Sequence, residues 1–342
     1  MLPPRLVRRI VLAPLAIVIA CGLVVLFPLL ALAFGIVGLS RSRRLRAFRV
    51  LCFAVIWLVA ETAALVMCLG LWIASGFGGR MHSSRFQRRH YAVMRWFLDV
   101  LYRAAERTFD LRVTVTEPVY DADEQAARLA RPVIVLSRHA GPGDSFLLVH
   151  QLLTVYGRQP RVVMKAAIQL DPGIDVVGNR LPNVFIKHKQ AGGGLFTEQI
   201  TRLAADLDSD GALVIFPEGG NWTPGRWRRG IQRLERLGRG DLASRARAMP
   251  NLLPPRAGGT LAALAACPTA DVIFVAHAGL DQLVSVRDVW RNLPVEQTIQ
   301  ARWWRVPVAE VPRDASHELQ VQWLFAWWEQ IDAWITASRV VP

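Results

Sequence analysis

The sequence predicts an α/β fold, in which helices flank a sheet, preceded by a pair of membrane-embedded helical segments. Six short runs rich in apolar and β-branched residues alternate with helix-like stretches, as strands and helices do in α/β proteins. Near the N-terminus, two stretches of thirty residues contain almost no charge. We therefore expect an N-terminal membrane anchor over residues 1–80 and an α/β domain over residues 81–342.

The anchor prediction depends on two apolar stretches. Residues 10–39 carry no charge, and residues 50–79 carry only Glu61. A membrane helix needs about 20 apolar residues, so either stretch is long enough. A cleaved signal peptide is the alternative, because Ala31-Leu32-Ala33 resembles a cleavage site. The apolar region is too long for that, and a second stretch follows at once. We interpret Glu61 as a protonated, hydrogen-bonded helix contact.

The charge is unevenly distributed along the chain. The formal net charge is +14, and residues 1–90 contribute +11, because twelve arginines stand there against Glu61. A nucleic-acid-binding protein would spread its basic face over the folded domain, so we exclude nucleic acid as a partner. Arginines that flank apolar segments are typical of proteins held against anionic headgroups, which predicts the lipid bilayer as a partner.

The orientation of the anchor is open from the sequence. Arginine clusters lie at residues 5–9, 41–49 and 80–89. Two full spans would place the middle cluster outside, against the positive-inside rule. The alternative is that each segment re-enters on one face, with Pro28 breaking the first. The four cysteines show no paired spacing, which fits a catalytic domain on the cytoplasmic face of the cell membrane.

The remaining elements follow in order. The strand-like runs cover residues 112–116, 132–136, 161–164, 183–186, 212–215 and 272–276. Residues 86–107 mix arginine with aromatic residues, which predicts either an interfacial amphipathic helix or a helix packed on the domain. Trp303-Trp304 indicates core packing or a membrane-interface belt. In the C-terminal helix, Trp323, Trp327 and Trp334 have helical spacing, which favours a packed face.

Two polar motifs follow buried strand-like runs. Ser137-Arg138-His139-Ala140-Gly141-Pro142-Gly143-Asp144 is an H-x-x-x-x-D pattern in a Gly/Pro turn, and Phe216-Pro217-Glu218-Gly219-Gly220-Asn221 is the second motif. Groups at the ends of parallel strands meet at one edge of a sheet, so His139 and Glu218 are expected to be neighbours. Asp144 also suits the N-cap of a helix that begins at Ser145.

Together these motifs resemble the glycerolipid acyltransferases of the 1-acylglycerol-3-phosphate acyltransferase family, over roughly residues 90–285. Residues 183–187 are similar to the family's second motif, and residues 253–259 to its fourth. The pattern looks most like the longer branch that includes lysocardiolipin acyltransferases. Two departures stand out. Ser137-Arg138 replaces an Asn that many members have before the His, and Gly220-Asn221 replaces the common Thr-Arg, for which Arg226, Arg228 or Arg229 would have to substitute.

The resemblance implies a glycerolipid acyltransferase-type sheet and a membrane-bound enzyme of phospholipid synthesis or remodelling. Such an enzyme moves a fatty acyl group from acyl-CoA or acyl-carrier protein, its co-substrates, to the free hydroxyl of a lysophospholipid, with 1-acylglycerol-3-phosphate as the first expectation. No other cofactor is implied. In the family the Glu-Gly motif binds the acceptor, which assigns that role to Glu218 and Gly219, with Arg256 from the fourth motif beside them.

Lysine usage adds candidates for phosphate contact. The chain has 38 arginines but only three lysines, Lys165, Lys187 and Lys189, and all three fall within 25 residues. A compact point charge suits a phosphate, so Lys165 and Lys187 are predicted to contact one. Lys187 is also the best match to the family's second motif.

Acyl transfer to an alcohol needs a base, and histidine titrates near neutral pH. We predict His139 as the general base and Asp144 as the group that fixes its tautomer. The acceptor hydroxyl then attacks directly, without an acyl-enzyme. Backbone N–H groups at residues 141–143 or at Gly219-Gly220 are expected to stabilise the oxyanion.

Other functions stay open. An acyltransferase with a glycolipid acceptor is the nearest alternative. A membrane-associated serine hydrolase would use the His–Asp pair with a nearby serine such as Ser145, but the sequence has no G-x-S-x-G elbow. A non-catalytic membrane-binding protein is disfavoured by the intact His139, Asp144 and Glu218. No metal site is expected, because the seven histidines lack ligand spacing such as H-E-x-x-H.

Overall fold

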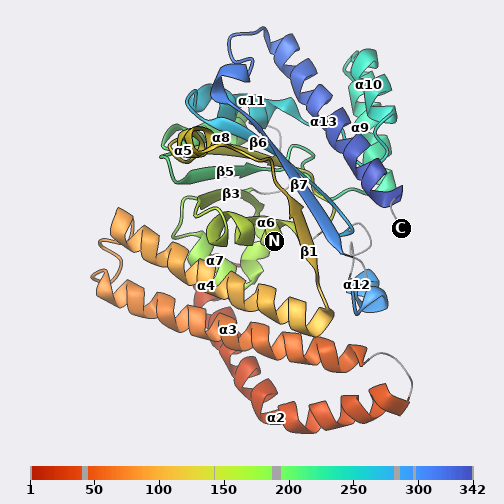
Figure 1. Cartoon of the computed structure of the whole chain (residues 1–342). Helices are drawn as coiled ribbons and strands as arrows, with labels where there is room; N and C mark the ends of the chain where they lie inside the picture. The colour runs from red at the N-terminus through yellow and green to blue at the C-terminus, as the bar shows by residue number, and fades with distance from the viewer. Residues whose placement is uncertain are drawn as a thin grey trace.

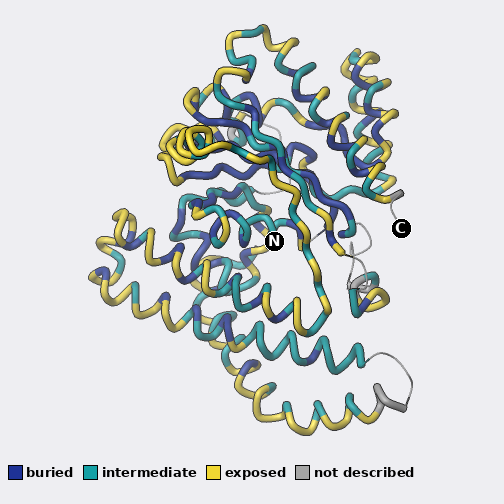
Figure 2. Tube along the Cα trace, in the orientation of Figure 1, coloured by how far each residue is buried: buried dark blue, intermediate teal, exposed yellow. Residues whose placement is uncertain are grey.

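A single sheet with helices on both faces forms the body of the protein, and two long apolar helices extend from it (Figure 1). The computed structural model describes residues 2–40, 45–141, 143–186, 194–280, 286–295 and 298–340. The predicted α/β class is confirmed. Figure 2 shows the strands as the most buried part of the chain and α2 (Ala13–Ser40) as largely exposed.

The sheet has seven strands in the order β1-β7-β6-β2-β5-β3-β4. Their bounds are β1 (Val113–Thr116), β2 (Val133–Ser137), β3 (Gln159–Lys165), β4 (Val184–Ile186), β5 (Gly211–Ile215), β6 (Asp271–Ala278) and β7 (Ile299–Val306). The pairs are parallel except β6 with β7, which is antiparallel. All six predicted strands are present. In the centre, β2 lies between β5 and β6, so the loops that follow these strands meet at one edge.

Strand β7 was not predicted, because two arginines and two tryptophans interrupt its apolar pattern. The structure explains the charge at Arg305, whose guanidinium pairs with the buried Asp271 at 2.7 Å. Trp303 is buried, and Trp304 contacts Trp334 edge to face. The pair Trp303-Trp304 therefore packs in the core rather than forming a membrane-interface belt.

Successive strand side chains point to opposite faces, and different helices cover each face. One face packs on α6 (Asp144–Thr154). The other packs on α8 (Gly194–Ala205), α11 (Ala257–Ala266) and α13 (His317–Val340). The other helices are α1 (Arg5–Val7), α5 (Ala122–Leu129), α7 (Pro172–Gly178), α9 (Pro224–Arg236), α10 (Gly240–Arg247) and α12 (Val286–Asn292), with short helical turns at Arg8–Leu12, Ala166–Leu170 and Val308–Glu310.

The tryptophans of α13 form the packed face that their spacing predicts. Trp327 stacks on Phe274 of β6, with ring centroids 4.5 Å apart, and Trp323 meets the same ring edge to face. Trp328 is fully buried and also meets the Phe274 ring edge to face, with centroids 6.3 Å apart. The helix is thus fixed to β6 next to the carboxyl edge of the sheet.

Helix α4 (Ser84–Phe109) packs between α3 (Arg46–Ala74) and α6, which supports the packed interpretation of residues 86–107. Its inner face buries Tyr91, Leu98 and Leu101. Its outer face is basic and also carries Trp96, which is 39% exposed. One side of α4 is therefore core, and the other is free to meet a surface.

Two helices, Arg5–Ile36 and Arg46–Ala74, are long and apolar enough to cross a membrane. The predicted break at Pro28 is wrong, because α2 continues through it from Ala13 to Ser40. A proline in an apolar helix is tolerated where the freed carbonyl finds another partner or the helix bends locally. The arginine loop at residues 41–44 lies outside the described residues.

Four of the arginines that were expected to meet lipid headgroups bind the protein instead. Arg8 and Arg9 both pair with Asp175 of α7, at 2.6 and 3.3 Å. At the start of α3, Arg46 donates to the carbonyl of Leu293 and Arg49 to that of Thr108. These four side chains therefore have partners inside the protein, and the lipid bilayer as a partner of the basic clusters stays a prediction. Basic residues beside apolar segments also suit protein carboxylates and carbonyls, which the sequence cannot distinguish.

Glu61 forms a helix contact, as expected, and the structure supplies its partner. The backbone N–H of Gly173 donates to Oε1 of Glu61 at 3.0 Å. A side chain at Gly173 would lie within 3.5 Å of Glu61 and Asp171, so glycine permits this close approach. The middle of α3 is thereby held against α7.

Candidate active site

His139 lies two residues after the carboxyl end of β2, which is Ser137. Between them, the backbone N–H of Arg138 donates to the carbonyl of Val275 in β6, so strand pairing continues for one residue beyond β2. Nδ1 of His139 lies 3.0 Å from each carboxylate oxygen of Asp144. Phe216 packs against the imidazole, with ring centroids 4.6 Å apart. When the proton sits on Nδ1 and is donated to Asp144, Nε2 carries the lone pair that a general base needs.

Asp144 lies at the first position of α6 rather than at its N-cap, which is Gly143. Its carboxylate accepts hydrogen bonds from the backbone N–H groups of Ala140 and Gly141, at 2.7 and 3.1 Å. Burial alone would raise the pKa of Asp144, but the hydrogen bond from His139 and the nearby His277 imidazole outweigh it and hold the pKa well below its usual range. Asp144 is therefore an anion that orients the His139 ring.

His277 is a second histidine at the same carboxylate, and the sequence reasoning missed it. It stands near the end of β6, with Nε2 3.6 Å from Oδ2 of Asp144. The available signal was its place directly after the predicted strand at residues 272–276. Asp144 thus lies between two imidazoles that reach it from neighbouring strands.

Glu218 lies beside His139, as the two motifs predict, but it faces the protein. One oxygen accepts from the backbone N–H of His139 at 2.8 Å, and the other from that of Leu253 at 2.9 Å. Burial raises the pKa of Glu218 to about 8, against the opposing effects of the Arg138 guanidinium and of these N–H groups. The prediction that Glu218 contacts an acceptor stays a prediction, and the geometry shows that it joins the loops of the first and fourth motifs.

Arg138 occupies the position where many relatives were expected to have Asn. It is almost fully buried. Its guanidinium donates to the carbonyls of His277, at 2.5 Å, and Asn251, at 3.3 Å. Arg138 thus ties the His139 loop to β6 and to the segment before the fourth motif.

Three cations lie around the Glu218 turn, namely Lys165, Arg226 and Arg256. Lys165 ends β3, and its pKa is lowered by burial and by Arg226. Arg256 lies over Gly219, where an added Cβ would be 3.3 Å from its guanidinium carbon. The positive φ of Gly219, +69°, also favours glycine at this turn. Lys187 and Lys189 lie outside the described residues, so their predicted phosphate contact stays a prediction.

Two of the expected oxyanion donors are already used inside the protein. The N–H of Gly141 donates to Asp144, and that of Gly219 donates to the carbonyl of Phe216 at 3.0 Å. Tight turns satisfy their own backbone groups in this way, which a glycine-rich sequence cannot reveal. Gly220 lies close to the guanidinium of Arg226, 3.4 Å from where its Cβ would be, so a charged donor stands beside the turn.

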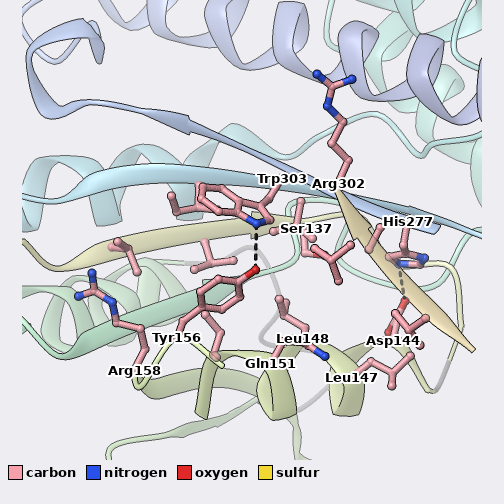
Figure 3. A pocket seen from close by; sticks show the side chains of 18 of the residues that line it. Ser137, Asp144, Leu147, Leu148, Gln151, Tyr156, Arg158, His277, Arg302 and Trp303 are labelled. Atoms are coloured by element: carbon pink, nitrogen blue, oxygen red, sulfur yellow. Dashed lines mark hydrogen bonds and ion pairs between the residues drawn. The ribbon is translucent and has the colours of Figure 1, made fainter. Parts of the chain in front are cut away.

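An apolar cavity of about 120 Å³ lies between the sheet and α6. One end reaches Asp144 and His277, and the other reaches Tyr156 and Trp303 (Figure 3). At that far end Trp303 donates from Nε1 to the Tyr156 hydroxyl at 2.9 Å, and Tyr156 donates to Glu117 at 2.6 Å. The walls between the two ends are mostly Val, Leu and Ile side chains. No pattern in the sequence indicates this cavity.

The comparisons with known proteins bear on the same region. Residues 112–268 match the family model described as Acyltransferase. The matched segment contains His139, Asp144, Glu218 and Arg256, and it covers less than half of the 342 residues. The match supports a general acyltransferase of the glycerolipid type, and the lysocardiolipin-like branch stays a prediction. No curated protein and no solved structure matches the chain.

Proposed function

We propose that this acyltransferase domain transfers a fatty acyl group from a thioester to the hydroxyl of a lysophospholipid, with 1-acylglycerol-3-phosphate as the first candidate. One observation carries the proposal: the His139–Asp144 pair lies beside a cluster of cations, and its Asp144 lines one end of an apolar cavity together with His277. An amphiphile with an acyl chain and a phosphate suits both neighbours.

The reaction follows from the base. His139 accepts the proton of the acceptor hydroxyl on Nε2, and the oxygen attacks the thioester carbonyl. The new C–O bond forms, the C–S bond breaks, and the thiolate leaves and recovers the proton from His139. Asp144 stabilises the imidazolium between these steps. No acyl-enzyme is needed, because the acceptor itself is the nucleophile.

The surrounding residues divide the remaining tasks. Lys165 and Arg256 bind the acceptor phosphate, with Lys187 as the further predicted partner. Arg226 substitutes for the arginine that is missing from the Phe216–Asn221 motif. Glu218 is a positioning residue that holds the His139 loop against the Leu253 segment. The fatty acyl chain extends along α6 in the apolar cavity, towards Tyr156.

A serine hydrolase fits the geometry less well. Ser145 donates its hydroxyl to Oδ1 of Asp144 at 3.2 Å, so it faces the orienting carboxylate rather than the basic nitrogen of His139. Ser137 donates to the carbonyl of Arg138. A fluorophosphonate probe is expected to leave the protein unlabelled. The geometry constrains the headgroup of the acceptor less than it constrains the reaction. An acyltransferase with a glycolipid acceptor therefore stays the nearest alternative.

For the anchor, we propose that α2 and α3 enter the membrane from one side, with the catalytic domain on the cytoplasmic face of the cell membrane. Arg46 and Arg49 bind the domain at the start of α3, and the Cys68 carbonyl near its end accepts from Arg180. A helix held at both ends runs along the domain rather than away from it. A cysteine at position 45 should resist labelling from outside intact cells, and labelling there would support full spans.

The decisive experiment is an assay of the purified full chain with a panel of lysophospholipids and glycolipids and with both thioester donors, read by mass spectrometry. The variant His139→Ala should lower transfer at least a hundredfold, the range of general-base catalysis, while vesicle binding is unchanged. The exposed His317→Ala serves as the control. Substantial transfer by His139→Ala would reject the assignment.

A further inference from the structure

Helix α9 carries a row of exposed arginines that begins at the candidate active site. The row consists of Arg226, Arg229, Arg233 and Arg236, and all four are exposed. At 3.6 residues per turn, these four residues fall within about 80° of one another on the helix surface, over about 15 Å of the helix length. We call this set the arginine row. Arg228 is also exposed but lies off the row.

The arginine row is electrostatically continuous with the cations of the site. At its beginning, the Arg226 guanidinium lies beside Gly220 and contributes to the lowered pKa of Lys165, after the effect of burial. Two turns farther along, Arg233 contributes in the same way to the lowered pKa of Arg256. Positive potential therefore extends from the Glu218 turn outward along α9.

The row differs from its neighbours in having no acidic partner. Arginines of the following segment and of α10 are paired: Arg239 with Glu318, Arg245 with Glu329, and Arg247 with Glu235. Within the described part of the chain, none of the four row arginines forms an ion pair with a carboxylate. Like charges three and four residues apart destabilise a helix. An external polyanion bound to the row would relieve this repulsion.

The position of α9 narrows the kind of polyanion. Helices α9 and α10 pack on the sheet face that α11 and α13 cover, whereas α3 and α4 lie beyond the opposite face (Figure 1). A bilayer that holds α2 and α3 is therefore not the surface that the row meets. Small anions bind mainly in concave sites, but the row lies on the exposed side of a helix. An acidic protein surface about 15 Å long matches it better.

We propose that the arginine row is the docking surface for a small acidic carrier protein that delivers the acyl group as its thioester. The inference rests on the proposed acyl transfer and selects between its two donors. Docking along α9 places the carrier next to the Glu218 turn, from which a thioester arm can extend to His139. Arg236, at the far end, contacts the carrier protein and is remote from the transferred group.

The test compares initial rates with acyl-carrier protein and with acyl-CoA of the same chain length, using the purified full chain. The variants Arg229→Glu and Arg236→Glu should each raise KM for acyl-carrier protein at least tenfold and leave kcat within about twofold. KM for acyl-CoA should change less than twofold. Arg228→Glu is the matched control, because it makes the same charge change on the same helix outside the row. For the unaltered protein, KM for acyl-carrier protein should rise with salt.

Other results would overturn the proposal. An equal rise in KM for both donors would mean that the row binds coenzyme phosphates. Unchanged kinetics of the variants with both donors would mean that the row has no role in transfer. Weakened binding of the variants to anionic vesicles would mean that the row binds lipid. Binding of the carrier protein alone, measured by fluorescence anisotropy, separates docking from chemistry. The unaltered protein could bind the carrier protein and lose this binding in Arg236→Glu, yet transfer no acyl group. That result would reject the proposed function and support the docking surface.

Discussion

The backbone N–H of His139 donates to Oε1 of Glu218 at 2.8 Å, so the carboxylate of the Phe216–Asn221 motif holds the backbone of the His139 motif. Its other oxygen does the same for Leu253. The carboxylate thereby sets the position of the His139 loop from behind. Burial raises the pKa of Glu218 to about 8, and the nearby Arg138 guanidinium opposes this rise only in part.

Replacing Glu218 with Gln should disturb this arrangement while preserving the side chain's size. The amide NH₂ cannot accept, so one of the two buried N–H groups loses its partner, at a cost of about 1–3 kcal/mol. We expect a lower melting temperature and a kcat at least tenfold lower, with little change in KM for the thioester. Glu310→Gln, on the surface, is the control. A normal kcat at reduced stability would make Glu218 purely structural.

Asp144 should contribute stability that depends on pH in a defined direction. Its folded-state pKa lies below the unfolded value of about 4, so the unfolded chain binds more protons below that pH. The contribution is complete above pH 4 and is lost as the pH falls further. The difference in melting temperature between the wild type and Asp144→Asn should therefore be largest near neutral pH and shrink below pH 4. A constant difference would contradict the depressed pKa.

The cavity along α6 should select the acyl chain. Leu148 lines its middle, and Leu148→Trp would fill space there (Figure 3). Each buried methylene is worth about 0.8 kcal/mol, so excluding two of them should lower kcat/KM for long-chain donors about tenfold relative to short-chain donors. Leu319→Trp, on the surface of α13, is the control. Equal losses for all chain lengths would place the acyl chain elsewhere.

The sequence predicts the central features because they depend on local patterns. Buried strands leave continuous apolar runs, and the loops after β2 and β5 must meet once those strands pair. That is why His139 and Glu218 are neighbours, as expected. Strand β7 was not predicted, because the charge of its Arg305 is neutralised by Asp271, a partner 34 residues away in the sequence.

What the sequence leaves undetermined depends on side-chain direction and on partners far along the chain. Nothing local indicates that Glu218 turns inward to two N–H groups, or that His277 reaches Asp144 from β6. Likewise, arginines beside apolar segments look alike whether they face lipid or protein. Arg8 shows the difference, because its partner Asp175 lies 167 residues away.

The Arg8–Asp175 pair offers the sharpest test of how the anchor is joined to the domain. Both side chains are buried, and Gln169 also accepts from Arg8, at 3.0 Å. Removing one partner of a buried pair costs roughly 3–5 kcal/mol, because the other charge stays buried and uncompensated. Asp175→Asn should therefore lower the melting temperature in detergent substantially. The double variant Arg8→Met/Asp175→Leu should recover most of the loss, whereas Arg9→Met, at a more exposed arginine, should cost about 1 kcal/mol or less. If Asp175→Asn melts like the wild type, the N-terminal segment is not docked on α7 as the structure has it.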